Sequence, residues 1–141
     1  MLKISRLADY GSSVMRYLAY FGGQPKSAVE VAEGTHLALP TVRKVLKLLQ
    51  NSGLLISARG ADGGYKLSKE LKNINLAEIV EAIDGPIALT ECSVGQKHPC
   101  GHTQVCTMKK DWQLINGLIK DALSKQTLEK LCYGQIGELG D

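Results

Sequence analysis

The fold is decided by residues 27–67, which read SAVEVAEGTHLALPTVRKVLKLLQNSGLLISARGADGGYKL. Ser27 and Glu30 have the spacing of a capping box, in which each side chain accepts a hydrogen bond from the other residue's backbone amide. The box predicts a short helix that ends at about Gly34, because glycine readily adopts the left-handed conformation that terminates helices. Pro40 suits the first position of the next helix, which we expect to end near residues 52–53.

The second of these predicted helices has one apolar face and one basic face. Its apolar residues follow the i, i+3, i+4, i+7 spacing of a single helix face: Val42, Val45, Leu46 and Leu49. Its outer surface carries Arg43, Lys44 and Lys47. Two short helices joined by a tight turn form a helix-turn-helix pattern, and the DNA major groove, about 12 Å wide, admits one such helix. The basic face is therefore a candidate DNA-binding surface, with an ordinary solvated helix face as the alternative.

A glycine-rich hairpin is predicted immediately after these helices. Residues 54–57 and 65–67 have the composition of short strands, and the connecting residues 58–64 contain three glycines, which allow the positive φ angles of a tight loop. Arg59 lies near the tip of this loop, where an extended guanidinium group suits a narrow minor groove. Together with the two helices, the hairpin predicts a winged helix-turn-helix domain.

Helical patterns flank this domain on both sides. Before it, residues 5–21 predict an amphipathic helix; after it, helices are expected at residues 75–83 and 109–124, with a short last helix from Thr127. The apolar positions of the 109–124 helix cover more than one face: Trp112, Leu114, Ile115, Leu118, Ile119, Ala122 and Leu123. At least one face should therefore pack on a second chain or on the first domain.

Composition and charge are those of an ordinary globular protein. The 141 residues are 44% hydrophobic and 22% charged, which fits one domain with a small appendage. No stretch approaches the roughly 18 consecutive apolar residues of a membrane helix, and the charged N-terminus is unlike a signal peptide, so we expect a cytoplasmic protein with no membrane partner. Residues 1–73 hold eleven Lys and Arg against five Asp and Glu, a net +6, whereas residues 74–141 hold six against nine, a net −3. This asymmetry favours a polyanion as the partner of the first half, with chance drift of solvated surface charge as the alternative.

Three of the four cysteines lie close together in the sequence, at Cys92, Cys100 and Cys106. In a reducing cytoplasm, such clustering indicates a metal or cluster site before a disulfide. Thiolates are the ligands that iron-sulfur clusters prefer, but zinc bound with His98 or His102, redox-active thiols and inert cysteines remain alternatives. Cys132 stands apart and is expected to be a small buried hydrophobe.

Five further segments are distinctive. They are the run SRLADYGSSVMRYLA, the hairpin RGADGGYKL, the helix LAEIVEAIDG, the cysteine loop with a tryptophan six residues after its last cysteine, and the closing TLEKL. With the helix-turn-helix, they resemble the IscR/NsrR family of winged-helix transcription regulators over nearly the whole chain, and the opening LKISRLADYG is most similar to members that regulate the SUF system of iron-sulfur cluster assembly. The resemblance implies a homodimer with one iron-sulfur cluster per chain, 4Fe-4S or 2Fe-2S, held by Cys92, Cys100 and Cys106.

The resemblance leaves the fourth cluster ligand to be assigned. In the IscR-like branch it is a histidine three residues after the last cysteine, but this chain has Lys109 there, a poor iron ligand. In the NsrR-like branch it is an aspartate near the start of the first helix of the partner chain, and the matching residue here is Asp9. His98 and His102 are the remaining candidates, and the alternative for Asp9 is an ordinary first-turn aspartate stabilised by the helix dipole.

The resemblance also places DNA contacts at Thr41 and Arg43, at the start of the recognition helix, and at Arg59 on the wing. Position 43 is acidic in the IscR-like branch. Because a cationic side chain favours guanine edges or phosphate over cytosine, we expect a different operator.

The expected architecture is mainly α with a small β-hairpin. It comprises a winged helix-turn-helix DNA-binding domain in residues 1–73, a connecting helix in 74–89, a cysteine cluster-binding loop in 90–108, and a dimerisation helix and tail in 109–141. The predicted function is a transcription regulator, a repressor, that binds double-stranded operator DNA, senses an iron-sulfur cluster and controls cluster assembly genes. No nucleophile motif points to an enzyme or to a small-molecule substrate. The alternatives are a nitric-oxide or redox sensor of the same family, and a zinc or thiol protein acting through protein partners.

Overall fold

The computed structural model describes residues 3–60, 63–90 and 107–134 of the chain. Its elements, in chain order, are α1 (Arg6–Tyr20), α2 (Ala28–Thr35), α3 (Leu39–Asn51), β1 (Leu55–Ala58), β2 (Gly64–Leu67), the 3-10 turn η1 (Leu71–Asn73), α4 (Leu76–Asp84), α5 (Lys109–Ser124) and the π-helical turn η3 (Lys130–Gly134). The expected mainly α architecture with one small hairpin is confirmed. The helix predicted at 109–124 has the predicted bounds, and those at 5–21 and 75–83 agree within one residue at each end.

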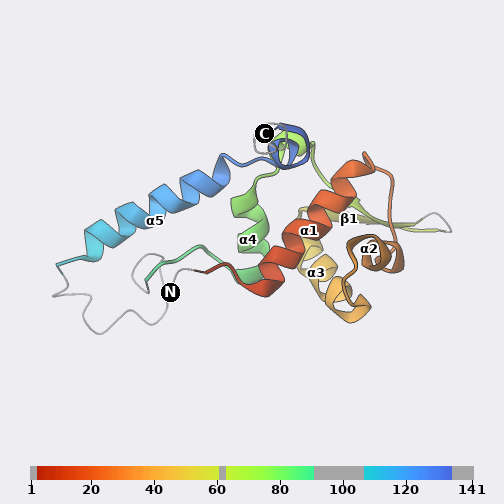
Figure 1. Cartoon of the computed structure of the whole chain (residues 1–141), viewed down its shortest axis with the longest axis horizontal. Helices are drawn as coiled ribbons and strands as arrows, with labels where there is room; N and C mark the ends of the chain where they lie inside the picture. The colour runs from red at the N-terminus through yellow and green to blue at the C-terminus, as the bar shows by residue number, and fades with distance from the viewer. Residues whose placement is uncertain (1–2, 61–62, 91–106, 135–141) are drawn as a thin grey trace.

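Helices α1, α2 and α3 pack around one hydrophobic core, with α1 lying across α3 (Figure 1). The predicted apolar face of α3 is fully buried in this core: Val42, Val45, Leu46 and Leu49. On α1, Val14, Met15 and Leu18 face the same core. Full burial of each such side chain contributes about 1.5–3 kcal/mol, so the apolar stripe fixes which face of α3 remains outside.

The capping box at the start of α2 is confirmed. The Glu30 amide donates to Ser27 Oγ and the Ser27 amide donates to Glu30 Oε1, both over 3.1 Å. The prediction that Gly34 ends this helix in a left-handed conformation is wrong, because the helix continues to Thr35 and His36 adopts that conformation with φ 59°. Gly34 instead permits a close approach of helices, since a Cβ at this position would collide with the ring of Tyr17 on α1.

Leu39, rather than Pro40, occupies the first position of α3. Pro40 follows in the second position and Ala38 is the N-cap residue, without a capping side chain. Proline is tolerated there because amides in the first turn have no partner within the helix.

Strand β2 of the wing is paired on both of its edges. Strands β1 and β2 are antiparallel, with Leu55 opposite Leu67 and Ser57 opposite Tyr65. On the other edge of β2, Tyr65 exchanges two backbone hydrogen bonds with Lys26, of 3.0 and 2.7 Å, in the segment between α1 and α2. Gly64 has φ +151°, and a Cβ there would collide with the Lys26 backbone, so only glycine fits this pairing.

Helix α4 connects the winged domain to α5. Its N-cap is the predicted Asn75, whose side chain accepts from the Glu78 amide over 3.0 Å, and its end is marked by Gly85 at φ +85°. Helix α5 projects to one side of the domain while the hairpin extends to the other (Figure 1). After α5 the chain returns to α4, where Leu128 donates its amide hydrogen bond to the Ile74 carbonyl over 2.7 Å. Among the described residues, no helix is both long enough and apolar enough to cross a membrane.

Candidate functional site

The predicted DNA-contacting side chains lie on one recognition surface formed by α3 and the wing. Arg43, Lys44 and Lys47 are exposed on α3, on the side opposite its buried stripe, and Thr41 is partly exposed near its start. Arg59 is exposed directly after β1. Within residues 3–60, 63–90 and 107–134, none of these four cations forms a salt bridge, so their charge is available to an external anion.

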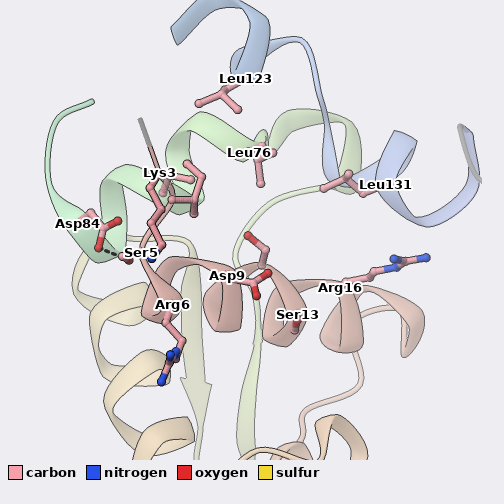
Figure 2. A pocket seen from close by; sticks show the side chains of 13 residues that line it. Lys3, Ser5, Arg6, Asp9, Ser13, Arg16, Leu76, Asp84, Leu123 and Leu131 are labelled. Carbon is pink, nitrogen blue, oxygen red and sulfur yellow. Dashed lines mark hydrogen bonds between the residues drawn. The ribbon is translucent and has the colours of Figure 1, made fainter. Parts of the chain in front are cut away.

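The second candidate region is a groove of about 1070 Å³ between α1, α4 and the C-terminal part of the chain, which contributes Leu123 and Leu131. Figure 2 shows Asp9 in the α1 wall of this groove, with Arg6 and Arg16 to either side along the helix. The opposite wall is apolar and includes Leu76 and Leu131.

Asp9 is the acidic residue of the first turn of α1 and its side chain is exposed. The turn is already capped by Ser5, whose hydroxyl accepts from the Ala8 amide over 3.0 Å and donates to Asp84 over 2.7 Å. In the described part of the chain, the Asp9 carboxylate has neither a hydrogen-bond partner nor an ion-pair partner. Ser5 therefore caps this turn without Asp9, and the Asp9 carboxylate is open to a ligand in the groove.

The predicted cluster ligands Cys92, Cys100 and Cys106 lie outside the described residues, as do His98 and His102. In the described ranges, no three His, Cys, Asp or Glu side chains gather in a group able to hold a metal ion. The chemistry of the predicted donor set, three thiolates and one carboxylate, suits iron.

Cys132 fits its prediction as a buried hydrophobe. Its side chain is a free thiol packed in the core, and burial raises its pKa, an effect opposed by the positive charge of Arg16. A thiol held in its neutral form is a poor nucleophile and a poor metal ligand. Cys132 is therefore chemically distinct from the clustered cysteines.

One polar residue that the sequence analysis missed contacts the segment that precedes the cysteine loop in the sequence. Asn116 is the one buried residue of α5, whose sixteen residues are all described, and is 6% exposed. Its Oδ1 accepts from the Leu89 amide over 2.8 Å and its Nδ2 donates to the Ile87 carbonyl over 2.9 Å. The signal was a lone asparagine one helical turn after Trp112 in an otherwise apolar pattern.

Part of the apolar surface of α5 faces outward. Leu114 and Leu118, one turn apart, are 66% and 60% exposed, and Trp112 and Ile115 are also exposed. Ile119 and Leu123 are partly buried. On the α4 side, Lys120 Nζ and Glu81 Oε1 form an ion pair of 3.0 Å. One side of α5 thus packs on its own chain and a second apolar side is left without a partner among the described residues.

Comparison with known proteins decides the family. The Rrf2 family, described as an iron-dependent transcriptional regulator, matches residues 4–134. This chain belongs to the Rrf2 family. The Rrf2 chain is accordingly a transcriptional regulator and not an enzyme, and the resemblance to IscR and NsrR is confirmed.

Relatives of this Rrf2 chain include regulators with different names. It is 31% identical to the HTH-type transcriptional regulator CymR of Bacillus subtilis over 138 residues, which cover 97% of this chain and 94% of the relative. It is 29% identical to the regulator NsrR of Shouchella clausii over 131 residues, which cover 89% and 83%.

Solved structures show the same winged-helix fold. The structure of CymR, titled the global cysteine regulator of B. subtilis, superimposes with a TM-score of 0.72 at 32% identity, covering 94% of this chain and 97% of that one. The structure of T. potens IscR superimposes with a TM-score of 0.67 at 28% identity, covering 92% and 85%.

Proposed function

We propose that this Rrf2 regulator is a homodimer that binds a pseudo-palindromic DNA operator in the cytoplasm. Each α3 would enter a major groove, with Thr41, Arg43, Lys44 and Lys47 at phosphates and base edges and Arg59 at the adjacent minor groove. The exposed cations on α3 and the wing, which form no salt bridge with any described residue, support this assignment. Two such domains related by a twofold axis read half-sites about 34–36 Å apart or a multiple of that distance.

The outward apolar side of α5 is proposed as the dimer contact. Leu114 and Leu118 lie on this side with more than half of their surface exposed. Large contiguous apolar patches are uncommon on monomers and usually mark an interface. Two copies of α5 packed along this side would remove these leucines from water.

The proposed signal is an iron-sulfur cluster, 4Fe-4S or 2Fe-2S, one per chain, held by Cys92, Cys100 and Cys106. When bound, such a cluster would make the protein responsive to the supply of iron and sulfide. The single observation that carries the fourth-ligand proposal is the Asp9 carboxylate in the groove, which has no partner among the described residues; we assign this role to Asp9 of the partner subunit. Because α1 packs directly on α3, a ligand on α1 would bias how the two DNA-binding domains are oriented.

The proposed targets are iron-sulfur cluster assembly genes, with the protein acting as their repressor. Support comes from the similarity to IscR and from the opening sequence around Asp9. Cluster occupancy would then report whether supply meets demand.

A second candidate is a regulator that responds to cysteine or thiol supply without a cluster. The observation that favours it is the 31% identity to CymR over nearly the full length of both chains. A nitric-oxide or redox signal is a third possibility within the family, supported by the similarity to NsrR.

The deciding experiment is anaerobic purification followed by visible spectroscopy and analysis of iron, sulfide and zinc. The cluster proposal expects a coloured protein with matching iron and sulfide, which Cys106→Ala abolishes and the control Cys132→Ala retains. If the protein loses its colour on exposure to nitric oxide more readily than under iron limitation, the NsrR-like signal would be favoured. A colourless protein whose DNA affinity follows thiol oxidation would favour the CymR-like candidate, and stoichiometric zinc would give the loop a structural role.

A further inference from the structure

The hydrogen bonds of Asn116 are directed at two backbone groups of the segment after α4. Leu89 and Ile87 belong to an irregular segment after α4, and in the described part of the chain the Leu89 amide and the Ile87 carbonyl bond only to this side chain. A partly buried amide or carbonyl that loses its hydrogen-bond partner destabilises the conformation that it occupies. The asparagine therefore determines where residues 87–89 lie on α5, which an apolar side chain of similar size could not do.

This contact defines one end of the cysteine loop. Cys92 follows Leu89 by three residues, and Cys106 precedes the first residue of α5, Lys109, by three. The residues that precede the loop are thus bound to Asn116 of α5, and the residues that follow the loop begin the same helix. Seven residues of α-helix span about 10 Å, so α5 holds the two ends of the loop at a fixed separation along its axis.

The same helix is connected to the DNA-binding domain. Helix α5 packs on α4, and α4 packs through the fully buried Ile79 on the core that contains α3. A displacement of residues 87–89 would therefore be transmitted to α5 and, through α4, to the recognition helix.

We propose that Asn116 is a positioning residue, which fixes the entry of the cysteine loop on α5 and so couples the state of the loop thiols to the dimer helix. The inference rests on the proposed function in that the loop thiols form the sensing site. Without the two hydrogen bonds, residues 87–89 would gain conformational freedom, and ordering the thiols around a metal would cost more entropy.

The test compares Asn116→Leu and Asn116→Ala with the control Lys120→Gln, which removes the neighbouring ion pair and leaves the asparagine intact. Three quantities are measured on the full-length protein: amide exchange of Leu89, the affinity of the metal-free reduced protein for Cd²⁺ from its thiolate absorption band, and the rate of loss of the native chromophore to a chelator. Thermal unfolding and sedimentation report whether each variant remains folded and dimeric.

We expect both Asn116 variants to show faster Leu89 exchange, and Cd²⁺ affinity and chromophore lifetime lower by about tenfold or more, as for other residues that orient metal ligands. Lys120→Gln should leave all three unchanged. Equal Cd²⁺ affinity and chromophore lifetime in folded Asn116 and Lys120 variants would overturn the positioning role. A wild-type protein without iron and sulfide would instead refute the cluster proposal, while a lower Cd²⁺ affinity of the Asn116 variants would still support positioning.

Discussion

Gln50 on α3 donates a hydrogen bond from its Nε2 to the Oγ of Ser57 on β1 over 3.1 Å. The bond joins the recognition helix to the wing at a point where neither residue is buried in the core. Since both elements are proposed to contact DNA, the bond sets the angle between the two contacts.

Replacing Gln50 with Ala should therefore weaken operator binding more than it weakens the fold. An exposed hydrogen bond contributes about 0.5–1.5 kcal/mol, so the operator dissociation constant should rise by roughly two- to tenfold. Fluorescence anisotropy with a labelled operator measures this change. The control is Gln24→Ala, an exposed glutamine between α1 and α2, and equal effects of the two variants would show that the bond does not orient the wing.

Arg59→Ala should weaken operator binding and reduce its salt dependence. Each neutralised phosphate contributes about 0.9 to the slope of log affinity against log salt, so loss of one contact lowers the slope by about that amount. Lys72→Ala removes an exposed cation that is paired with Glu70 over 3.3 Å, and it should leave the slope unchanged. An unaltered slope for Arg59→Ala would place the wing away from DNA, and a flat salt response of the wild type would argue against DNA binding through this surface.

Two helical glycines should respond oppositely to alanine. At Gly34 a Cβ collides with the ring of Tyr17, so Gly34→Ala should destabilise the fold by about 1–3 kcal/mol. At Gly117 of α5 a Cβ meets nothing within 4 Å, so Gly117→Ala should add up to about 1 kcal/mol through helix propensity. Urea unfolding measures both, and the close-packing explanation requires that Tyr17→Leu relieve most of the cost of Gly34→Ala.

Asp9→Asn should make the chromophore more labile without affecting the fold. The side chain makes no hydrogen bond or ion pair within the described ranges, so its neutralisation removes only a ligand, and chelator-driven loss should accelerate about tenfold or more. Asp111→Asn alters the acidic residue in the first turn of α5 and serves as the matched control. If both variants keep the wild-type spectrum and lifetime, Asp9 has only a helix-dipole role.

Leu118→Asp should dissociate the dimer. A carboxylate in the proposed α5 contact would be buried without a partner, and sedimentation velocity should show a monomer at micromolar concentration. Tyr133→Asp places the same charge at another large side chain of similar exposure, 61%, outside α5, and should remain dimeric. A dimeric Leu118→Asp protein would move the interface elsewhere.

Local patterns in the sequence were sufficient for most of the fold. The Ser27 and Glu30 box and the apolar stripe of α3 depend on residues within two helical turns of one another, so their spacing determines the outcome. The error at Gly34 came from a contact between distant segments, since Tyr17 lies on another helix and no spacing rule connects these two positions. The recognition surface followed from the stripe because the exposed face of α3 is its complement.

The candidate sensing site was less accessible to sequence reasoning. The role of Asn116 depends on the packing of α5 against residues 87–89. Leu89 lies twenty-seven positions before Asn116 in the sequence, so no local pattern connects the two. The resemblance suggested Asp9 as a cluster ligand, whereas only the three-dimensional structure shows that Ser5 caps its turn.

The pairing of Lys26 with Tyr65 limits how far this DNA-binding unit could be trimmed. A two-stranded hairpin alone is marginally stable in water, and here the backbone before α2 completes its second edge. A fragment beginning at Ser27 would lose α1 from the hydrophobic core and would also expose the Tyr65 amide and carbonyl. The segment between α1 and α2 is thus part of the wing, to which the bridge at Lys26 joins it.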